Sequence, residues 1–549
     1  MLSKFASGQD LPTCRRIGYL LLAGLCWSVL FSPASVAFTP ASEPENPEIR
    51  FAPGRRNFQT NAHPFEERLD QWRGSSLGMS LVGVLPGRLT IDKVRQGLAA
   101  ERAGLQRGDR ILQIGPLDLT RQGKEQLKEL LAELPPASRL EIRIARRANP
   151  EQQSTESEQD RTRLVEKKFE LVTDSKAMLD AWLVAERLGK NRVIREHLAS
   201  LGESDKLEGL KNELLQAVRN APTPRLAHEA INAGIDQLGV SHTALIPGWG
   251  YARLTNRQQG GIGLTLQRIS QQQKQKYFVV DMEPGGPAFE SEIRVGDEVL
   301  AVNGVSLERS ARLVLAGEEQ HHQLFLVTSQ PDEEIRLEVR KTAAGKTVAV
   351  SMQSDPNLTA NSASRASLKV LPFEGKKFGY YRIWNLMSMK TNTFLADALQ
   401  NEFSDCDGLI LDLRGRGGSI PVVQRVEKTV IQSGLPVACI IDRHSRSAKE
   451  ILAIRLKGNP NVRLIGQTTC GAVTAATFAG LPSGNALMFP VTSGSKLSRY
   501  TRGINLEGKG VTPDETIDFS LPYLNGKQPL LDSAKKTLQR MISSKNGTR

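Results

Sequence analysis

The alternation of apolar and polar residues divides the chain into strand-like and helix-like stretches. Four stretches are strand-like, three of them with a period of two, and they predict two hairpins. Their strands are 140–147 with 164–172, and 335–341 with 347–352. Residues 174–238 instead carry apolar positions at helical spacing, and either Asp174 or Ser175 can cap the first helix. Thr223-Pro224 starts a later helix, with proline at its first position.

A different order begins near residue 379, where short apolar runs alternate with helical patterns. Residues 379–383 are strand-like, 393–403 are helical, and 408–413 form a buried strand that runs into a Gly-rich turn. After a further helix, residues 435–441 form another apolar strand, and a helix follows from Ala448. Strand–helix alternation with buried strands predicts an α/β core.

Two segments repeat one pattern: a glycine-containing apolar loop, a Gly-Asp turn and an apolar strand. The loops are Ser76-Leu77-Gly78-Met79 and Gly261-Ile262-Gly263-Leu264, and the turns are Gly108-Asp109 and Gly296-Asp297. Such recurrence indicates two copies of one module, and both copies resemble PDZ domains. The resemblance implies that extended peptide ends bind by strand addition, with the carboxylate at Gly261, Ile262, Gly263 and Leu264 of the second copy. For the first copy, a purely structural bracing role is an equal alternative.

The composition narrows the classes of partner. A mean hydropathy of −0.31 excludes a polytopic membrane protein, and 549 residues predict several domains. The net charge is +13, but Lys and Arg are scattered and aromatic residues make up only 5%. We therefore expect no nucleic-acid partner, whereas a weak association with anionic membrane surfaces fits the charge.

The N-terminal stretch predicts export. Arg15-Arg16 precede the apolar run 17–30, and a small-x-small cleavage site follows that ends at Ala37. Residues 1–37 are therefore predicted to be a signal peptide. The expected location is the periplasm or the exterior, with an uncleaved, membrane-tethering signal as the alternative.

The remaining cysteines predict neither a disulfide framework nor a metal site. Cleavage at Ala37 would leave Cys406, Cys439 and Cys470, an odd number that argues against systematic pairing. Their spacing to histidine fits no metal site, and no cofactor is expected.

Ser447 is the candidate nucleophile, because it stands on the turn between the apolar strand 435–441 and the helix from Ala448. A serine there ends a rigid element, and the first N–H groups of the helix face developing negative charge. The alternative is that Ser447 only caps the helix.

Several separated motifs together resemble the C-terminal processing (tail-specific) serine peptidases. They are Asp412-Leu413-Arg414-x-x-Gly417-Gly418, Ser447-Ala448-x-Glu450 and Gly510-Val511-x-Pro513-Asp514, and the resemblance covers about residues 230–520. It implies a crotonase-like α/β core and a Ser–Lys dyad. However, Ala472 stands where the lysine is expected, and alanine cannot act as a base. Lys449 is a poor substitute, because on a helix it would point away from Ser447.

The chain is more similar to the tricorn protease branch, which implies a Ser-His-Glu site. Ser447 would be the nucleophile, His242 the general base and Glu507 the orienting carboxylate, with Ser241 as a fourth member. The oxyanion donors would be Ala448 and Gly418, with Gly417 as its neighbour. Asp412 and Arg414 are expected to fix the turn, and His444, the rival base, is expected at the surface.

The predicted fold is a multidomain chain with an α/β crotonase-like peptidase core, two PDZ (β-rich α+β) domains and a helical segment. The predicted ranges are 1–37 signal peptide, 38–73 tether, 74–173 first PDZ, 174–258 helical segment, 259–353 second PDZ, 354–530 core and 531–549 basic tail. The predicted function is an exported serine endopeptidase for unfolded or tail-exposed polypeptides, whose C-termini bind the PDZ domains. A catalytically inactive scaffold and a retinoid or lipid carrier are the alternatives.

Overall fold

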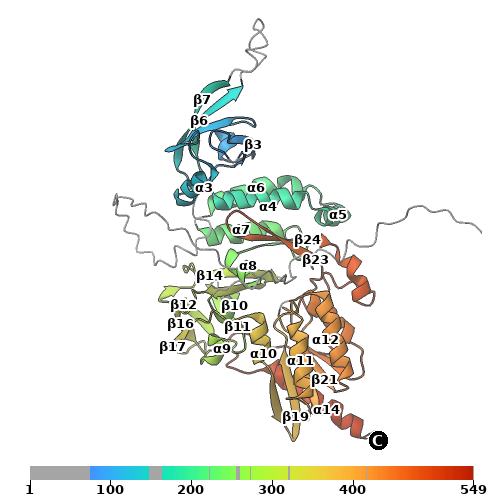
Figure 1. Ribbon diagram of the computed structural model, residues 1–549. Helices are drawn as coiled ribbons and strands as arrows, with labels where there is room; N and C mark the ends of the chain where they lie inside the picture. The colour runs from blue at the N-terminus through green and yellow to red at the C-terminus, as the bar shows by residue number, and fades with distance from the viewer. Residues whose placement is uncertain are drawn as a thin grey trace, which may run out of the picture. The chain divides into compact units, whose positions relative to one another are not determined.

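The computed structural model describes residues 75–547, apart from 84, 148–163, 222, 255–259, 272–273, 320–321 and 416. The predicted signal peptide and tether lie outside the described residues. In the part of the chain that is described, no helix is long and apolar enough to cross a membrane. The predicted fold class is confirmed: two PDZ modules, a helical segment and an α/β core are present (Figure 1).

The first PDZ module is a twisted sheet in the order β2-β3-β4-β6-β7, with β5 paired to β4. Its elements are β2 (Met79–Val82), β3 (Thr90–Val94), α2 (Ala99–Arg102), β4 (Arg110–Ile114), β5 (Leu117–Asp118), α3 (Lys124–Glu133), β6 (Arg139–Arg147) and β7 (Leu164–Val172). The predicted hairpin is β6–β7, which pairs from Arg139↔Val172 to Arg147↔Leu164. Outside this sheet, β1 (Ser75–Ser76) pairs with β8 (Asp174–Ser175) and leads into the helical segment.

Four helices follow, and the first and the last of them are capped by residues that the sequence predicts. They are α4 (Lys176–Gly189), α5 (Arg192–Leu201), α6 (Lys206–Asn220) and α7 (Pro224–Asp236). The Ser175 side chain accepts from Met178 N, and that of Thr223 accepts from Leu226 N. Their buried faces share one apolar cluster with Leu245 and Leu487, which belong to the three-stranded sheet β23-β24-β9.

That sheet joins segments far apart in the sequence. β9 (Ala244–Ile246) follows the helices and precedes α8 (Gly248–Leu254), whereas β23 (Ala475–Gly480) and β24 (Ala486–Thr492) come from the core. Figure 1 shows β23 and β24 beside α7. Buried Asp180 of α4 accepts hydrogen bonds from Ser483 and Asn485 in the β23–β24 turn, so polar contacts also hold the helices to this hairpin.

The second PDZ module has the sheet order β14-β15-β10-β11-β12-β16-β17, with β13 paired to β12. Its elements are β10 (Gly261–Gln271), β11 (Lys274–Met282), α9 (Pro287–Glu290), β12 (Glu298–Val302), β13 (Val305–Ser306), β14 (Leu313–Glu319), β15 (His322–Thr328), β16 (Glu334–Arg340) and β17 (Thr347–Gln353). The predicted hairpin is β16–β17.

The α/β core is a six-stranded sheet in the order β18-β19-β20-β21-β22-β25, parallel except for β18. Its strands are β18 (Lys369–Phe373), β19 (Lys376–Arg382), β20 (Gly408–Asp412), β21 (Val437–Ile441), β22 (Val462–Gly466) and β25 (Glu515–Thr516). Its helices are α10 (Ala360–Ala366), α11 (Lys390–Gln400), α12 (Ile420–Gln432), α13 (Ala448–Leu456) and α14 (Pro529–Gly547), and the 3-10 turn η3 (Gly494–Tyr500) follows β24.

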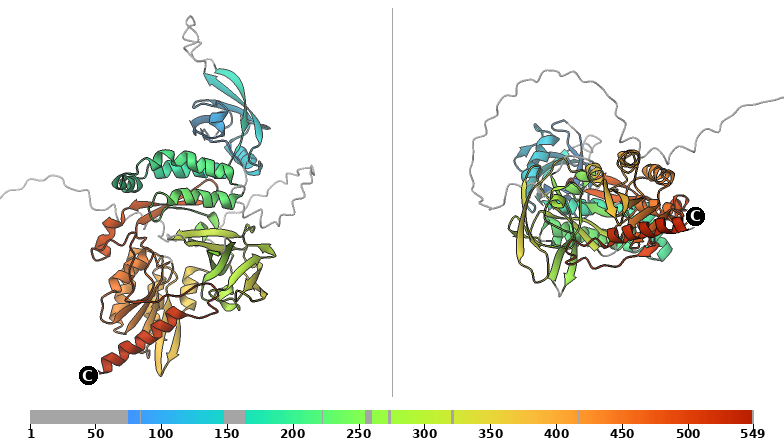
Figure 2. Two further views of the ribbon diagram at one scale, coloured as in Figure 1. Left: turned by 180° about the vertical axis from the view of Figure 1, so that it is seen from behind. Right: turned by 90° about the horizontal axis from the view of Figure 1, so that it is seen from below.

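Helices cover both faces of this sheet. α11, α12 and α13 share an apolar cluster with one face, and α14 packs on the other, as the views in Figures 1 and 2 show. β20 and β21 are therefore buried along their whole length. One prediction is wrong here: residues 531–549 are not a tail, because Leu531, Ala534 and Leu538 of α14 are core residues beneath the sheet. Charged and polar residues interrupt the apolar stripe of this helix in the sequence.

Candidate active site

Ser447 lies on a strained turn between a buried strand and a helix. β21 ends at Ile441 and α13 begins at Ala448, and between them Ser447 has φ 57° and ψ −124°. An ordinary N-cap residue has an extended backbone, and a positive φ costs a non-glycine residue on the order of 1–3 kcal/mol. The conformation favours the nucleophile interpretation over a simple cap, because a strained strand-to-helix turn exposes a nucleophilic serine.

Glu450, in the first turn of α13, fastens this turn to the segment 469–472. Its buried carboxyl group accepts four hydrogen bonds. The donors are Ser447 N at 3.0 Å, Thr469 Oγ1 at 2.6 Å, Gly471 N at 2.6 Å and Ala472 N at 2.9 Å. Burial raises the pKa of Glu450, although the hydrogen bonds act in the opposite direction. The sequence motif contains this glutamate, but its role as a brace is visible only in the structure.

The position of the missing lysine is next to Ser447. The Ser447 N–H donates to the carbonyl oxygen of Ala472 over 2.8 Å. The Ala472 side chain is buried and carries no ionisable group. A base for Ser447 must therefore come from another element.

Glu507 is attached to the same segment. Its Oε2 accepts hydrogen bonds from Val473 N at 2.9 Å and Thr474 N at 3.0 Å, and Gly508 N donates to Gly471 O over 2.7 Å. The segment 469–474 thus connects to the Ser447 turn on one side and to Glu507 on the other. The structure brings the predicted nucleophile and the predicted carboxylate to one short stretch of backbone.

Strand pairing sets the direction of the segment that carries His242, which lies far upstream of Ser447 in the sequence. It precedes β9, in which Ala244 pairs with Met488 of the antiparallel strand β24. Residues before Ala244 are therefore directed toward Pro490, which pairs with Ala476 at the start of β23. Because β23 directly follows the segment that anchors Glu507, the pairing directs His242 to that end of the sheet.

The local geometry of the Ser241-His242 pair is also unusual. Ser241 Oγ lies 3.2 Å from His242 Nδ1, and a partner at one ring nitrogen selects the tautomer at the other. His242 has φ 57°, so both His242 and Ser447 are among the nine non-glycine residues with positive φ in the described chain. Backbone strain of this kind concentrates at functional sites.

The Gly-rich turn after β20 approaches Ser447 closely. A Cβ at Gly417 would lie 2.6 Å from Ser447 Cβ, and one at Gly418 would lie 2.3 Å from Leu386 Cβ. Glycine is therefore required at both positions. Of the two predicted oxyanion residues in this turn, Gly417 is the one that packs on Ser447, whereas Gly418 packs on Leu386. Ala448, the third, is the first residue of α13.

A buried lysine that the sequence does not identify as important supports the Gly-rich turn. Lys449 is fully buried, and its Nζ donates to Arg414 O at 2.6 Å and Trp384 O at 3.2 Å. Burial, followed by the positive charge of Arg382, lowers the pKa of Lys449 to about 7. Lys449 therefore ties α13, which carries Ser447, to the turn, which carries Gly417.

Asp412 and Arg414 have the structural role that the sequence predicts. Arg414 donates to Asp412 through its backbone N–H and its guanidinium, and Tyr380 OH donates to the same carboxylate at 2.8 Å. Burial opposes ionisation of Asp412, but the charges of Arg414 and Arg382 outweigh it and lower its pKa. Arg382 in turn donates to Asp281 of the second PDZ module at 2.6 Å.

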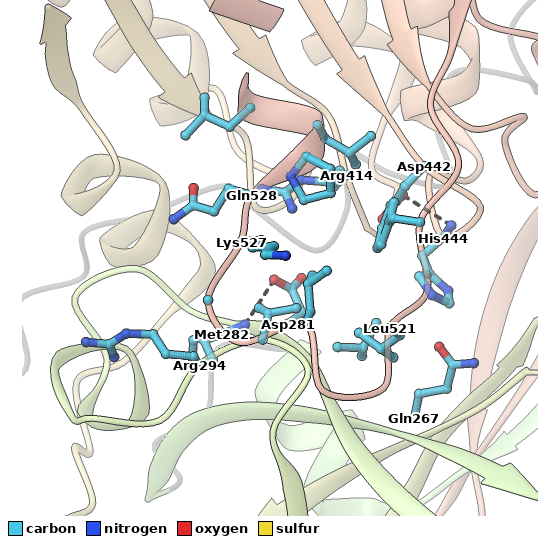
Figure 3. Close-up of a pocket in the computed structure, with 18 of the residues that line it drawn as sticks. Gln267, Asp281, Met282, Arg294, Arg414, Asp442, His444, Leu521, Lys527 and Gln528 are labelled. Carbon is cyan, nitrogen blue, oxygen red and sulfur yellow. Dashed lines mark hydrogen bonds between the residues drawn. The ribbon is translucent and has the colours of Figure 1, made fainter. Parts of the chain in front are cut away.

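His444 is not a surface residue, and this prediction is wrong. It is 7% exposed, because the loop after β21 faces the second PDZ module across a cavity. The Asp442 carboxylate accepts the backbone N–H of His444 at 3.1 Å. Figure 3 shows His444 and Asp442 at one side of a cavity of about 950 Å³, with Asp281 and Met282 of β11 at another. Gln267 and Lys527 also line it, so the cavity separates the second PDZ module from the core.

The predicted peptide-binding residues of the second PDZ module are buried. Gly261, Ile262, Gly263 and Leu264 start β10, which is paired with β11 on one side and with β15 on the other. The neighbourhood of Gly263 is tight, because a Cβ there would lie 2.9 Å from a methyl carbon of Leu358. The three free cysteines, Cys406, Cys439 and Cys470, are buried as well.

Three family models match the chain. The model of peptidase family S41 matches residues 419–517, and two PDZ domain models match 90–146 and 252–317. The S41 range includes Ser447, Ala472 and Glu507, whereas His242 precedes all of the second PDZ match.

Curated relatives include C-terminal processing proteases. Carboxyl-terminal-processing peptidase 2 of Arabidopsis thaliana is 23% identical over 333 residues, which cover 56% of this chain and 64% of the relative. The carboxy-terminal processing protease CtpB of Bacillus subtilis is 22% identical over 289 residues, covering 46% and 56%. The chain thus spans between about half and two thirds of the length of these relatives.

Solved structures with similarity include the photosystem II D1 C-terminal processing protease, with a TM-score of 0.38 and 18% identity. That match covers 64% of this chain and 97% of the other. The tricorn protease matches with a TM-score of 0.36 and 15% identity, covering 73% of this chain and 40% of the other.

Proposed function

Because this chain carries a peptidase family S41 domain and two PDZ domains, we propose that it is a serine endopeptidase of the C-terminal processing kind. Its substrates are unfolded polypeptides or polypeptides with an accessible carboxyl end. The observation that carries the proposal is the strained Ser447 turn, held by Glu450 to the segment that anchors Glu507.

In the proposed mechanism, His242 accepts the Ser447 hydroxyl proton while Ser447 Oγ attacks the scissile carbonyl carbon. Glu507 stabilises the imidazolium that forms. The backbone N–H groups of Ala448 and the Gly417-Gly418 turn bind the oxyanion. His242 then gives the proton to the leaving amine, and water releases the acyl chain by the same steps. The methyl group of Ala472 supports the use of histidine, because no amine stands at that position.

A fluorophosphonate probe tests the site directly. We expect the intact chain to be labelled and to cleave a denatured, fluorescein-labelled protein, while Ser447→Ala abolishes both. His242→Ala and Glu507→Gln should fold normally but lose labelling by about 10³–10⁴-fold, as removal of a triad member does. Absence of labelling in the intact, folded chain would overturn the proposal and leave a peptide-binding scaffold.

We also propose that the protein is exported, on the strength of the basic residues, the apolar run and the small-residue site that end at Ala37. N-terminal sequencing of the protein from the periplasm or the medium should begin at Phe38. Recovery of the full-length chain in the cytosol alone would contradict this.

A further inference from the structure

The two PDZ modules have corresponding elements in the same order, with one exception. In the first, β2, β3, α2, β4 and β5 are followed by α3 and then by the hairpin β6–β7. In the second, β10, β11, α9, β12 and β13 are followed by β14 and β15 and then by the hairpin β16–β17. The helix α3 is therefore replaced by a pair of strands, and the replacement lies at the edge at which PDZ modules accept peptides.

The sequence explains the replacement. Residues 124–133 of the first module are mostly Lys, Glu, Gln, Leu and Ala, which favour a helix. β15 instead contains the run Leu324-Phe325-Leu326-Val327-Thr328, and β14 begins Leu313-Val314-Leu315. Aromatic and β-branched residues favour extended structure. The difference between the modules is thus encoded locally.

β15 occupies the place of a captured peptide. It runs antiparallel to β10, with Thr328 opposite Gly261 and Leu326 opposite Thr265. A peptide whose carboxylate lies at the Gly261–Leu264 loop must also run antiparallel to β10, with its last residues at that loop. β15 therefore has the direction and the place of a ligand while it belongs to the chain itself.

This resident strand is built into the core of its module. Phe325 is fully buried, packs edge-on against Tyr277 at 5.5 Å and lies under the Arg268 guanidinium at 5.1 Å. Leu324 and Val327 are also buried. A peptide that displaced β15 would have to expose these side chains to water, so exchange is disfavoured.

The first module presents the same edge without such a strand. β2 is the last strand of its sheet, and among the described residues only β3 pairs with it. The Leu81 carbonyl of β2 instead receives Lys124 Nζ from α3, at 3.4 Å. Gly78, in the apolar loop just before β2, has φ 68°. Val82 and Leu85 next to this edge are 51% and 61% exposed.

We propose that polypeptide tails are captured by the first PDZ module, between β2 and α3, and that β15 permanently fills the second. The ligand is an extended chain end with a free carboxylate and an acidic side chain near it. A backbone N–H of the ligand would donate to the Leu81 carbonyl in place of Lys124. The Lys124 ammonium would then form an ion pair with the acidic side chain of the ligand. This inference deepens the proposed peptidase function and rests on it.

The second module then has a different task. Its outer strand β14 lies beside β9, the strand that follows His242. With β15 in place, this module supports the histidine segment as part of the fold rather than responding to a ligand.

Photo-crosslinking locates the captured tail. The probe is a short, extended fluorescein-labelled peptide with a glutamate and a benzophenone residue near its free carboxyl end, added to the full Ser447→Ala chain. We expect crosslinks on β2 and α3, and much weaker labelling with the amidated peptide. Crosslinks on β10, or none on either module, would overturn the proposal.

A charge exchange tests the role of Lys124. We expect Lys124→Glu to lower the affinity for the glutamate peptide by about tenfold. The same substitution should raise the affinity for a peptide in which lysine replaces that glutamate. The matched control is Lys128→Glu, one turn along α3, where Lys128 is paired with Glu125 at 2.7 Å. It should leave both affinities nearly unchanged. Equal effects of the two substitutions would contradict the assignment.

Failure of this inference is distinguishable from failure of the proposed function. The unsubstituted chain, which retains Ser447, is assayed separately with the fluorophosphonate probe. That probe reacts with the serine whether or not a tail is bound. Labelling together with crosslinks on β10 would support the peptidase proposal and refute the capture site on the first PDZ module. Crosslinks on β2 without labelling would support the capture site and refute the peptidase proposal.

Discussion

Glu450→Gln is the sharpest test of how the nucleophile is held. The glutamate oxygens accept two hydrogen bonds each: Oε1 from Thr469 and Gly471, and Oε2 from Ser447 and Ala472. Glutamine has the same shape but replaces one of these oxygens by an NH₂ group, which donates. One or two buried donors therefore lose their acceptor, because the Ser447 N–H keeps the Ala472 carbonyl oxygen at 2.8 Å.

The magnitude follows from the number of donors that lose their acceptor. Each buried donor without a partner costs about 1–3 kcal/mol, so the free energy of unfolding should fall by about 1–6 kcal/mol. The Ser447 turn would also be held less tightly to the segment 469–472, where the backbone bond from Ser447 N to Ala472 O remains. Fluorophosphonate labelling should therefore slow by at least tenfold in the chain that remains folded.

The assay pairs urea unfolding with the labelling rate, measured under conditions where the variant is folded. The control is Glu427→Gln on α12, where the carboxylate accepts from Arg455 of α13 at 2.6 Å. That pair is partly exposed and should cost about 1 kcal/mol or less, with an unchanged labelling rate. If Glu450→Gln matched this control in both measurements, the brace would have no part in holding Ser447.

Three further outcomes follow. In Gly417→Ala the new methyl would meet Ser447 Cβ at 2.6 Å, so labelling should fall by at least tenfold, whereas Gly480→Ala, with nothing within 4 Å, should leave it unchanged. The pKa of Lys449 is lowered from 10.5 to about 7 in the folded chain, so between these pH values only the unfolded chain keeps the ammonium proton. The free energy of unfolding should therefore rise as the pH rises across that range. Lys449→Met should remove this rise in urea midpoints taken at several pH values, and an unchanged slope would refute the burial argument. Asp281→Asn should lower the free energy of unfolding by about 1–3 kcal/mol, because buried Arg382 loses a charged partner at 2.6 Å; a urea midpoint equal to that of the unsubstituted chain would speak against it.

Much of the candidate site follows from local sequence. The strand before Ser447, the helix after it and the glycines of the turn are all short-range patterns, and each forms where it is predicted. Glu507 accepts hydrogen bonds from Val473 and Thr474, in the segment that also contacts the Ser447 turn, and its role as the orienting carboxylate stays a prediction. The burial of His444 was not predictable, because the residue lies on a cavity shared with the second PDZ module, and only the tertiary packing brings these two segments together.

What the sequence by itself determined is the identity of the elements and the two kinds of module. Alternation and helical spacing record which side of each element faces away from water, and this needs only neighbouring residues. Only the tertiary structure decided which groups interact. Glu450 accepts four hydrogen bonds, Lys449 donates to two backbone carbonyls, and β15 pairs with the edge of β10. The physical reason is that an open strand edge or a buried carboxyl group can be satisfied by many segments. Which one satisfies it depends on the packing of the whole chain rather than on its local pattern.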